Sequence, residues 1–289
     1  MNKLLALLLA GTAWTIGPLR AAELVRDVEY GRVAGEPLLL DVHVPDGTGP
    51  FPVAILVHGG GWSRGDKNGL DEPGKGADIT AWFAPLSQAN FTWFSINYRL
   101  APAHRWPAGF DDLQTAIRWV KAHAADYRGD PQRIALFGHS SGGHVVCLAA
   151  TLADPTTRVQ AIVGFAAVTD LEADAARRGG LSLSLQQLLG LPQPVTPAAN
   201  ARLRELSPIN HVAAGLPPFL LLHGDADKTV PYEQSIRFQQ KLRASGVPCD
   251  LITIPGGPHG LLKWSALAPD YPEKMIGWLQ RTLASPAKP

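Results

Sequence analysis

The hydrophobic residues of this chain fall into short runs whose pattern changes near residue 50. Leu38–Pro45, which follows a similar segment at residues 28–33, alternates apolar and polar positions and predicts an antiparallel strand with one buried face. The six runs that follow are almost continuously apolar and predict strands buried on both faces. They cover Pro52–Val57, Phe91–Asn97, Arg133–Gly138, Ala161–Val168, Pro218–Gly224 and Cys249–Pro255.

Amphipathic segments with helical spacing lie between these runs. One opens at Pro107, another opens at Pro231 and closes at Gly246, and a third ends the chain. Strands that alternate with helices predict an α/β fold with a mostly parallel, doubly wound sheet. Leu171–Leu206 breaks the alternation, and we interpret it as a small helical insertion over one end of the sheet. No linker, repeat or low-complexity tract divides residues 23–289, which we expect to form one domain.

The composition favours a single globular core. Of the 289 residues, 46% are hydrophobic and 18% are charged, which is ample apolar content for one folded domain and unlike a disordered chain. The net charge is +1, and Lys and Arg are scattered along the sequence. The chain therefore lacks the basic patch that is typical of nucleic-acid-binding proteins.

Residues 1–22 differ in kind from the rest. One Lys precedes an apolar segment that is too short, and too interrupted by Gly, Thr and Pro18, to span a bilayer comfortably. The pattern predicts a secretory signal cleaved near Ala21 or Ala22, and hence a periplasmic or secreted protein without stable membrane association after cleavage. An N-terminal membrane anchor or a packed helix is the alternative.

The chain has two cysteines, Cys147 and Cys249. Export would permit a disulfide between them. Because Cys147 lies in an apolar helical segment and Cys249 lies at the start of a strand, we expect two buried free thiols, with a bridge as the alternative.

The strongest chemical signal is the stretch from Gly138 to Gly142, which fits the pattern G-x-S-x-G between a predicted strand and a predicted helix. In this nucleophile elbow the central serine occupies a strained turn that exposes its hydroxyl above the sheet. The register selects Ser140 as nucleophile and makes the backbone N–H of Ser141 available to an oxyanion. Taken alone, the motif also occurs by chance in ordinary loops.

A glycine-rich stretch, His58–Trp62, follows the first continuous apolar strand. Successive glycines let bare backbone N–H groups approach a developing oxyanion closely. We assign Gly60 and Gly61 as oxyanion donors, and we expect His58 to support the loop rather than to carry a proton. A flexible glycine loop without function is the alternative.

A serine nucleophile on this fold needs an acid and then a histidine, in that chain order. The loop after Pro218–Gly224 offers Asp225 and Asp227, and Asp225 alternatively serves only as an acceptor of turn N–H groups. His259 is the only one of nine histidines that follows both acids. The order requirement therefore leaves a single candidate base.

Five motifs carry a family resemblance: HGGGW, NYRLAPAHRWPAGFDDLQTAIRWV, DPQRIALFGHSSGGH, LPPFLLLHGDADKTVP and PHG. Together they resemble the hormone-sensitive-lipase-like esterases of the α/β-hydrolase superfamily, over about Pro52 to the C-terminus. The resemblance implies an α/β-hydrolase fold, the triad Ser140, Asp227 and His259, and the oxyanion donors Gly60, Gly61 and Ser141.

The chain departs from that family in two ways. His139 and Ser141 flank the nucleophile where an acidic residue and an alanine are common, and little more than a hairpin precedes HGGGW. Both features look more like the bifunctional feruloyl/acetyl-xylan esterase and kynurenine-formamidase-like branches, which argues against lipid-type specificity. Trp62 and Trp106 are candidates for the wall of an acyl pocket, with simple packing at the rim as the alternative.

Other polar residues are expected to be structural. We expect an ion pair between Arg99 and Asp112, and packing or capping roles for His139 and His144. Three further histidines have no metal-ligand spacing with nearby Cys or carboxylates: His104, His123 and His211.

The sequence thus predicts a serine carboxylic-ester hydrolase for short-chain acyl or aryl esters. Its partner would be a small-molecule or sugar-borne ester, and the chemistry needs no cofactor and no metal. The alternatives are an amide-cleaving acyl-peptidase or formamidase on the same triad and, from another class, a non-catalytic hydrolase fold used for binding. The sequence carries no signal for the oligomeric state.

Overall fold

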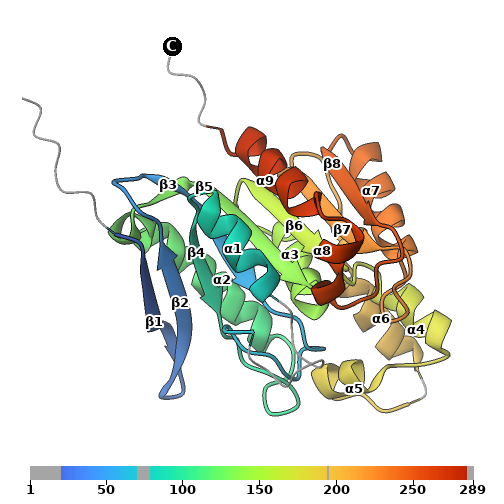
Figure 1. Cartoon of the computed structure of the whole chain (residues 1–289). Coiled ribbons are helices and arrows are strands. Elements are labelled where there is room, and N and C mark those ends of the chain that lie inside the picture. The colour runs from blue at the N-terminus through green and yellow to red at the C-terminus, as the bar shows by residue number, and fades with distance from the viewer. Residues whose placement is uncertain (1–20, 70–78, 194, 285–289) are drawn as a thin grey trace, which may run out of the picture.

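The computed structural model describes residues 21–69, 79–193 and 195–284. The described strands form one eight-stranded sheet in the order β1-β2-β4-β3-β5-β6-β7-β8 (Figure 1). β1 is antiparallel to β2, β2 is antiparallel to β4, and all the other neighbours are parallel. The strands are β1 (Glu23–Val33), β2 (Glu36–Val44), β3 (Phe51–Val57), β4 (Thr92–Ile96), β5 (Gly129–His139), β6 (Ala161–Phe165), β7 (Phe219–Gly224) and β8 (Cys249–Ile254).

Helices cover both faces of the sheet. Side chains of α1 and α9 share one apolar cluster, and side chains of α2, α3 and α7 share the cluster on the opposite face. Both faces of the central strands are therefore excluded from water, which explains their continuous apolar runs. The bounds are α1 (Thr80–Gln88), α2 (Ala108–His123), α3 (Ser141–Thr151), α7 (Glu233–Ala244), α8 (Trp264–Leu267) and α9 (Tyr271–Thr282), with short 3₁₀ turns at Ala124–Tyr127, Pro208–His211 and Leu261–Lys263.

The predicted insertion forms three short helices between β6 and β7: α4 (Leu171–Arg178), α5 (Leu183–Leu189) and α6 (Pro197–Glu205). Each begins with a side chain that accepts a hydrogen bond from the first helical turn, at Asp170, Ser182 and Thr196. The three helices gather at one end of the sheet (Figure 1).

The α/β-hydrolase architecture predicted from the sequence is confirmed. The helix α1 was not predicted, because it has only nine residues and contains Pro85, a residue that normally ends a helix. Its Trp82 and Leu86 are fully buried, so tertiary packing holds this short helix. The expected secretory signal at residues 1–22 lies almost wholly outside the described residues.

Two smaller predictions are also confirmed. The Arg99 guanidinium contacts both carboxylate oxygens of Asp112 at 2.7–3.0 Å, and the backbone N–H of Arg99 donates to the same carboxylate. Cys147 and Cys249 are free and buried, and burial raises the pKa of both thiols, that of Cys249 to about 12.

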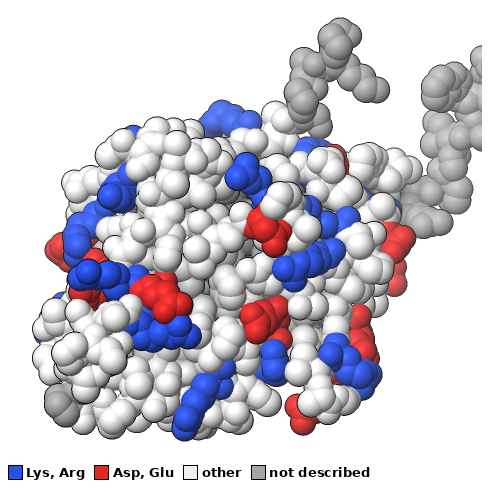
Figure 2. Space-filling model, turned by 180° about the vertical axis from the view of Figure 1, so that it is seen from behind, with Lys and Arg blue, Asp and Glu red and all other residues white. Residues whose placement is uncertain are grey.

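On the face shown in Figure 2, acidic and basic side chains are interspersed. None of the described helices is both long enough and apolar enough to cross a bilayer.

Candidate active site

Ser140 occupies a sharp turn between β5 and α3. Its backbone has φ +54° and ψ −116°, a conformation that is strained for a residue with a Cβ atom. The turn brings backbone segments into contact, so a Cβ atom at Gly138 would lie 2.4 Å from the carbonyl oxygen of Gly142. A Cβ atom at Gly142 would lie 2.4 Å from the carbonyl oxygen of His58. The local sequence therefore builds a nucleophile elbow.

The three residues predicted for the triad meet at the carboxyl ends of three strands. Nε2 of His259 lies 2.9 Å from Oγ of Ser140, and Nδ1 of His259 lies 2.7 Å from Oδ2 of Asp227. The Asp227 side chain is fully buried, and the His259 side chain is 20% exposed. The side chains thus form one continuous chain of hydrogen bonds from the serine hydroxyl to the carboxylate.

The structure also separates the two candidate acids. Asp227 reaches His259, and its other oxygen accepts the backbone N–H groups of Thr229 and Val230 at 2.7 and 2.9 Å. Asp225 is exposed and accepts the backbone N–H of Gly256 at 2.6 Å. Asp225 therefore has the turn-stabilising position that the sequence left open for it.

The charge of Asp227 is well stabilised. Burial alone would raise the pKa of its carboxyl group. Hydrogen bonds from His223 and His259, the positive character of His259 and the Val230 N–H together hold that pKa well below its usual range. The carboxylate is therefore ionised at neutral pH and can orient His259.

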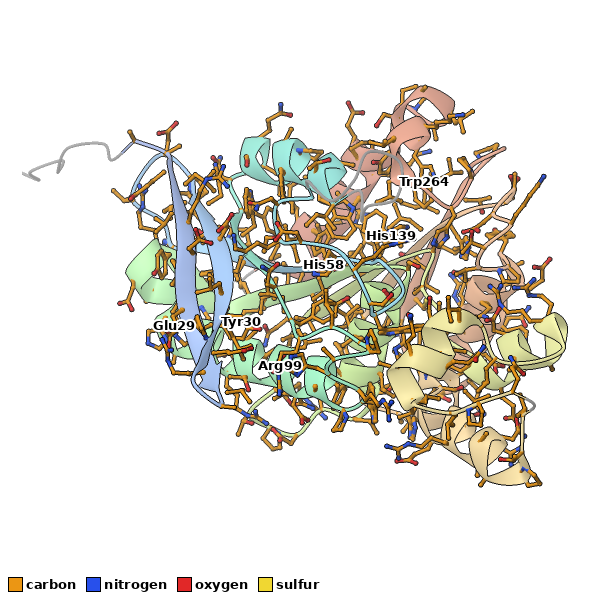
Figure 3. The ribbon with its side chains drawn as sticks, turned by 90° about the horizontal axis from the view of Figure 1, so that it is seen from below. Glu29, Tyr30, His58, Arg99, His139 and Trp264 are labelled. Carbon is orange, nitrogen blue, oxygen red and sulfur yellow. The ribbon has the colours of Figure 1, made fainter. Side chains whose placement is uncertain are left out.

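His139 holds the backbone of His259. The buried ring of His139 lies 4.9 Å from the ring of His259, and its Nε2 donates to the His259 carbonyl oxygen at 3.0 Å. Burial lowers the pKa of His139 to about 3, so this imidazole stays neutral beside the triad. Figure 3 shows His139 and His58 in the interior of the molecule.

The glycine-rich loop after β3 is held from several sides. His58 stacks on Tyr98 at 4.4 Å, and the Tyr98 hydroxyl donates to the His58 carbonyl oxygen at 3.0 Å. Gly60 has φ +103°, and a Cβ atom there would lie 2.2 Å from the Arg64 carbonyl oxygen. His58 therefore has the supporting position expected from the sequence.

A second buried histidine, His144 in the first turn of α3, connects this loop to the end of the insertion. Trp62 Nε1 donates to His144 Nδ1 at 3.2 Å, and His144 Nε2 donates to the Leu206 carbonyl oxygen at 2.8 Å. Burial lowers the pKa of His144 to about 4, so the ring is neutral and each nitrogen keeps its role.

A cavity of about 180 Å³ opens beside Ser140. Gly61, Trp62 and Ser141 line it on the side of the elbow, and the insertion supplies much of the opposite wall. The insertion contributes the side chains of Asp174, Arg178, Ser182 and Ser184, together with Leu185, whereas Val168 and Val230 add further apolar surface. The cavity is therefore small and carries charged and hydroxyl groups close to the serine.

Arg178 ties the insertion to the loop that carries Asp227. Its Nε contacts Asp174 at 2.8 Å, and its Nη2 donates to the Thr229 carbonyl oxygen at 2.7 Å. Arg177 contacts the other oxygen of Asp174 at 2.8 Å and does not line the cavity.

Of the two tryptophans predicted for the acyl pocket, one contacts the cavity. Trp62 lines the cavity, whereas Trp106 is not among its lining residues and packs on Phe110 at 5.1 Å. Gly60 is likewise not among the lining residues. Within the described ranges no group of three or more His, Cys, Asp or Glu residues could hold a metal ion.

The BD-FAE family model matches residues 40–242, which include the elbow, the glycine loop and Asp227. The chain belongs to the BD-FAE family. This confirms the resemblance to esterases of the α/β-hydrolase superfamily that the five motifs indicated.

The relatives that the chain matches include several esterases. The probable carboxylic ester hydrolase LipM of Mycobacterium tuberculosis is 36% identical over 252 residues, which are 81% of this chain and 56% of LipM. The carboxylesterase NlhH of the same species is 30% identical, over 76% of this chain and 69% of NlhH. The chain spans about half the length of LipM and of the esterases LipC and LipQ.

Solved structures of carbohydrate-directed enzymes share the fold. A truncated carbohydrate esterase from gut microbiota is 26% identical with a TM-score of 0.75, over 91% of this chain and 97% of that one. An acetyl ester-xyloside bifunctional hydrolase from Caldicellulosiruptor lactoaceticus is 27% identical with a TM-score of 0.71, over 92% of this chain and 98% of that one.

Three residues around the site were not predicted from the sequence: Arg178, Asp174 and His223. The two charged residues lie in the insertion, whose pattern indicated helices but not which face met the serine. His223 lies in the apolar run of β7, where a polar residue among apolar neighbours was the available signal.

We expect the two buried histidines of the site to make the protein less stable in acid. His139 and His144 are neutral in the folded state, whereas an unfolded chain protonates them near pH 6.5. Below that pH the unfolded state binds more protons than the folded state. The free energy of unfolding should therefore decrease as the pH is lowered from about 6.5 to about 4, and should not depend on these two groups above pH 6.5.

Urea denaturation at a series of pH values measures this slope. His144→Met removes one of the two groups and should reduce the slope by up to about 1.4 kcal/mol per pH unit, although the variant is less stable throughout. An unchanged slope in His144→Met would show that His144 does not titrate in this way.

Proposed function

We propose that this protein is a serine carboxylic-ester hydrolase that acts on short-chain acyl esters through an acyl-enzyme. The observation that carries the proposal is the hydrogen-bonded chain Ser140–His259–Asp227 at the nucleophile elbow. The similarity to the probable carboxylic ester hydrolase LipM and the carboxylesterase NlhH supports hydrolysis of carboxylic esters. Geometry and family thus point to the same chemistry.

The proposed reaction begins when Oγ of Ser140 attacks the ester carbonyl carbon and Nε2 of His259 takes the hydroxyl proton. The imidazolium then gives that proton to the leaving alcohol, which leaves an acyl-Ser140 intermediate. A water molecule, deprotonated by the same Nε2, hydrolyses the intermediate and releases the acid. Throughout, Asp227 keeps Nδ1 of His259 protonated and stabilises the imidazolium.

The developing oxyanion would be bound by the backbone N–H groups of Gly60, Gly61 and Ser141. Ser141 is the first residue of α3, so its N–H has no partner within the helix. Gly61 and Ser141 line the same cavity as Ser140. Fixed donors of this kind contribute most when charge forms on the carbonyl oxygen, and each is typically worth about 10²–10³ in rate.

The substrate is proposed to be a short acyl ester, including acyl groups borne by sugars. The small cavity supports the first part, and the polar side chains that the insertion adds to its lining can hydrogen-bond a hydroxylated group: Asp174, Arg178, Ser182 and Ser184. The fold shared with a carbohydrate esterase and an acetyl ester-xyloside hydrolase supports the second part.

The decisive experiment is hydrolysis of p-nitrophenyl acetate by Ser140→Ala. We expect a folded protein whose turnover falls by on the order of 10⁴ or more, because the nucleophile is gone. Ser141→Ala tests the register and should lower turnover by less than about tenfold, since only its backbone N–H is used. An active Ser140→Ala protein would leave a binding role for the fold as the better proposal.

The assignment of the acid predicts a contrast between two neighbouring aspartates. Asp227→Asn should lower kcat by on the order of 10⁴, because the amide favours the wrong tautomer of His259. The matched variant Asp225→Asn should act mainly on stability, since Asp225 contacts only a turn N–H. Steady-state kinetics with thermal melting separates these effects, and full activity in Asp227→Asn would remove it from the triad.

The size of the cavity predicts the acyl-chain profile. We expect kcat/KM to peak at acetyl to butyryl esters and to fall steeply by octanoyl. Each methylene adds about 0.8 kcal/mol of binding only while the cavity encloses it. A series of p-nitrophenyl esters, measured below the micelle-forming concentration, tests this. Faster cleavage of dodecanoyl than of butyryl esters would contradict it.

A further inference from the structure

A third buried histidine, His223, contacts the acid of the triad from inside the sheet. It lies in β7, four residues before Asp227, and its side chain is fully buried. Nε2 of His223 lies 3.3 Å from Oδ2 of Asp227 and 3.0 Å from the Val230 carbonyl oxygen. Nδ1 lies 2.7 Å from Oγ of Ser235 in α7, a side chain that is also fully buried.

These partners fix where the ring carries its proton. The Val230 carbonyl oxygen can only accept a hydrogen bond, so Nε2 of His223 must be the protonated nitrogen. The Ser235 hydroxyl can then donate to Nδ1. A flip of the ring would lose both contacts at once. The ring is therefore held with its Nε2–H directed at the Val230 carbonyl oxygen and within 3.3 Å of Oδ2 of Asp227.

The carboxylate of Asp227 is consequently surrounded by donors. One oxygen accepts the N–H groups of Thr229 and Val230, and the other is shared between His259 and His223. Of the two histidines on the shared oxygen, only His259 exchanges a proton with Ser140. The other is a fixed donor from the core of the sheet.

We infer that His223 is a positioning residue of the proposed triad, which holds Oδ2 of Asp227 toward His259 and limits how strongly that oxygen accepts from it. The inference rests on the proposed function. It adds a relay from Ser235 through His223 to Asp227, and so anchors the acid loop to β7 and α7.

Aromatic rings lie beside both ends of this relay. The ring of Tyr232 meets the edge of His223 at 5.6 Å, and the ring of His139 lies beside His259. His139 stays neutral and adds no positive charge beside His259, whereas the Asp227 carboxylate contacts His259 directly. A change at His223 should therefore reach His259 through the Asp227 carboxylate.

The test compares two substitutions of His223 in the full chain. His223→Leu keeps the volume and removes the donor, whereas His223→Gln places an amide N–H the same number of bonds from the backbone. With p-nitrophenyl acetate, and with active sites titrated by diethyl p-nitrophenyl phosphate, we expect His223→Leu to lower kcat by about tenfold to a hundredfold with little change in KM. His223→Gln should recover most of that loss.

The pH profile distinguishes positioning from a merely structural role. Without the His223 donor, the shared oxygen of Asp227 accepts more strongly and stabilises the imidazolium form of His259. The acid limb of kcat/KM should therefore move to higher pH in His223→Leu, by several tenths of a unit to about one unit. A variant that is only less stable would contain fewer active sites that react with diethyl p-nitrophenyl phosphate, but the acid limb of its kcat/KM profile would stay at the same pH.

Two further variants complete the design. His43→Leu is the matched control, because it also replaces a strand histidine by leucine but lies in β2, where His43 stacks on Trp93. It should leave the limb and kcat unchanged. Ser235→Ala provides a milder change should His223→Leu not fold. Without the Ser235 hydroxyl on Nδ1, the Nε2–H of His223 becomes a weaker hydrogen-bond donor. The acid limb of kcat/KM should therefore shift in the same direction by a smaller amount.

An unshifted limb and normal kcat in titrated His223→Leu would overturn the inference. If His223→Leu does not fold, an unshifted limb in Ser235→Ala would overturn it. A His223→Gln protein as impaired as His223→Leu would do so too, because shape and not the donor would then matter. A wild-type protein that fails to hydrolyse the ester would instead refute the proposed function, which is a different result.

Discussion

The reversed turn at Ser140 is the constraint on which the rest of the site depends. A residue with a Cβ atom in this conformation costs on the order of 1–3 kcal/mol, and the surrounding structure must impose it. β5 and α3 fix its two ends, Gly138 and Gly142 leave room for crossing backbone, and the Phe165 carbonyl oxygen accepts the Ser140 N–H at 2.9 Å. Several contacts at the centre of the sheet thus hold Ser140 in this conformation together.

Parallel strands bring the other residues to this turn. β5, β7 and β8 run in the same direction, so the loops after them leave the sheet at one edge. His139 and His223 then connect the loops after β8 and β7 to the sheet, and His144 connects the glycine-rich loop to the end of the insertion. A neutral imidazole suits this task, because it offers one donor and one acceptor without the cost of burying a charge.

The sequence predicted the parts of the site whose signals are local. The elbow, the glycine loop and the order of acid and base depend on short motifs beside strands, and the strands themselves follow from apolar runs. Arg178 was not predictable in the same way, because its contact with Thr229 arises only when the insertion meets the loop after β7. His223 lies only four residues before Asp227, but their contact depends on how the loop between them folds back. Helix α1 was missed for a related reason, since burial of Trp82 outweighs a sequence that is locally unfavourable.

The bond from Arg178 to the Thr229 carbonyl oxygen gives the insertion a second role besides enclosing the cavity. A hydrogen bond thus joins the insertion wall of the cavity to the loop that carries Asp227, two residues from Asp227 itself. In an evolutionary exchange of this insertion, the new segment would inherit both tasks. In this protein the cavity wall therefore cannot be replaced independently of the Asp227 loop, because a new wall would also have to supply this hydrogen bond.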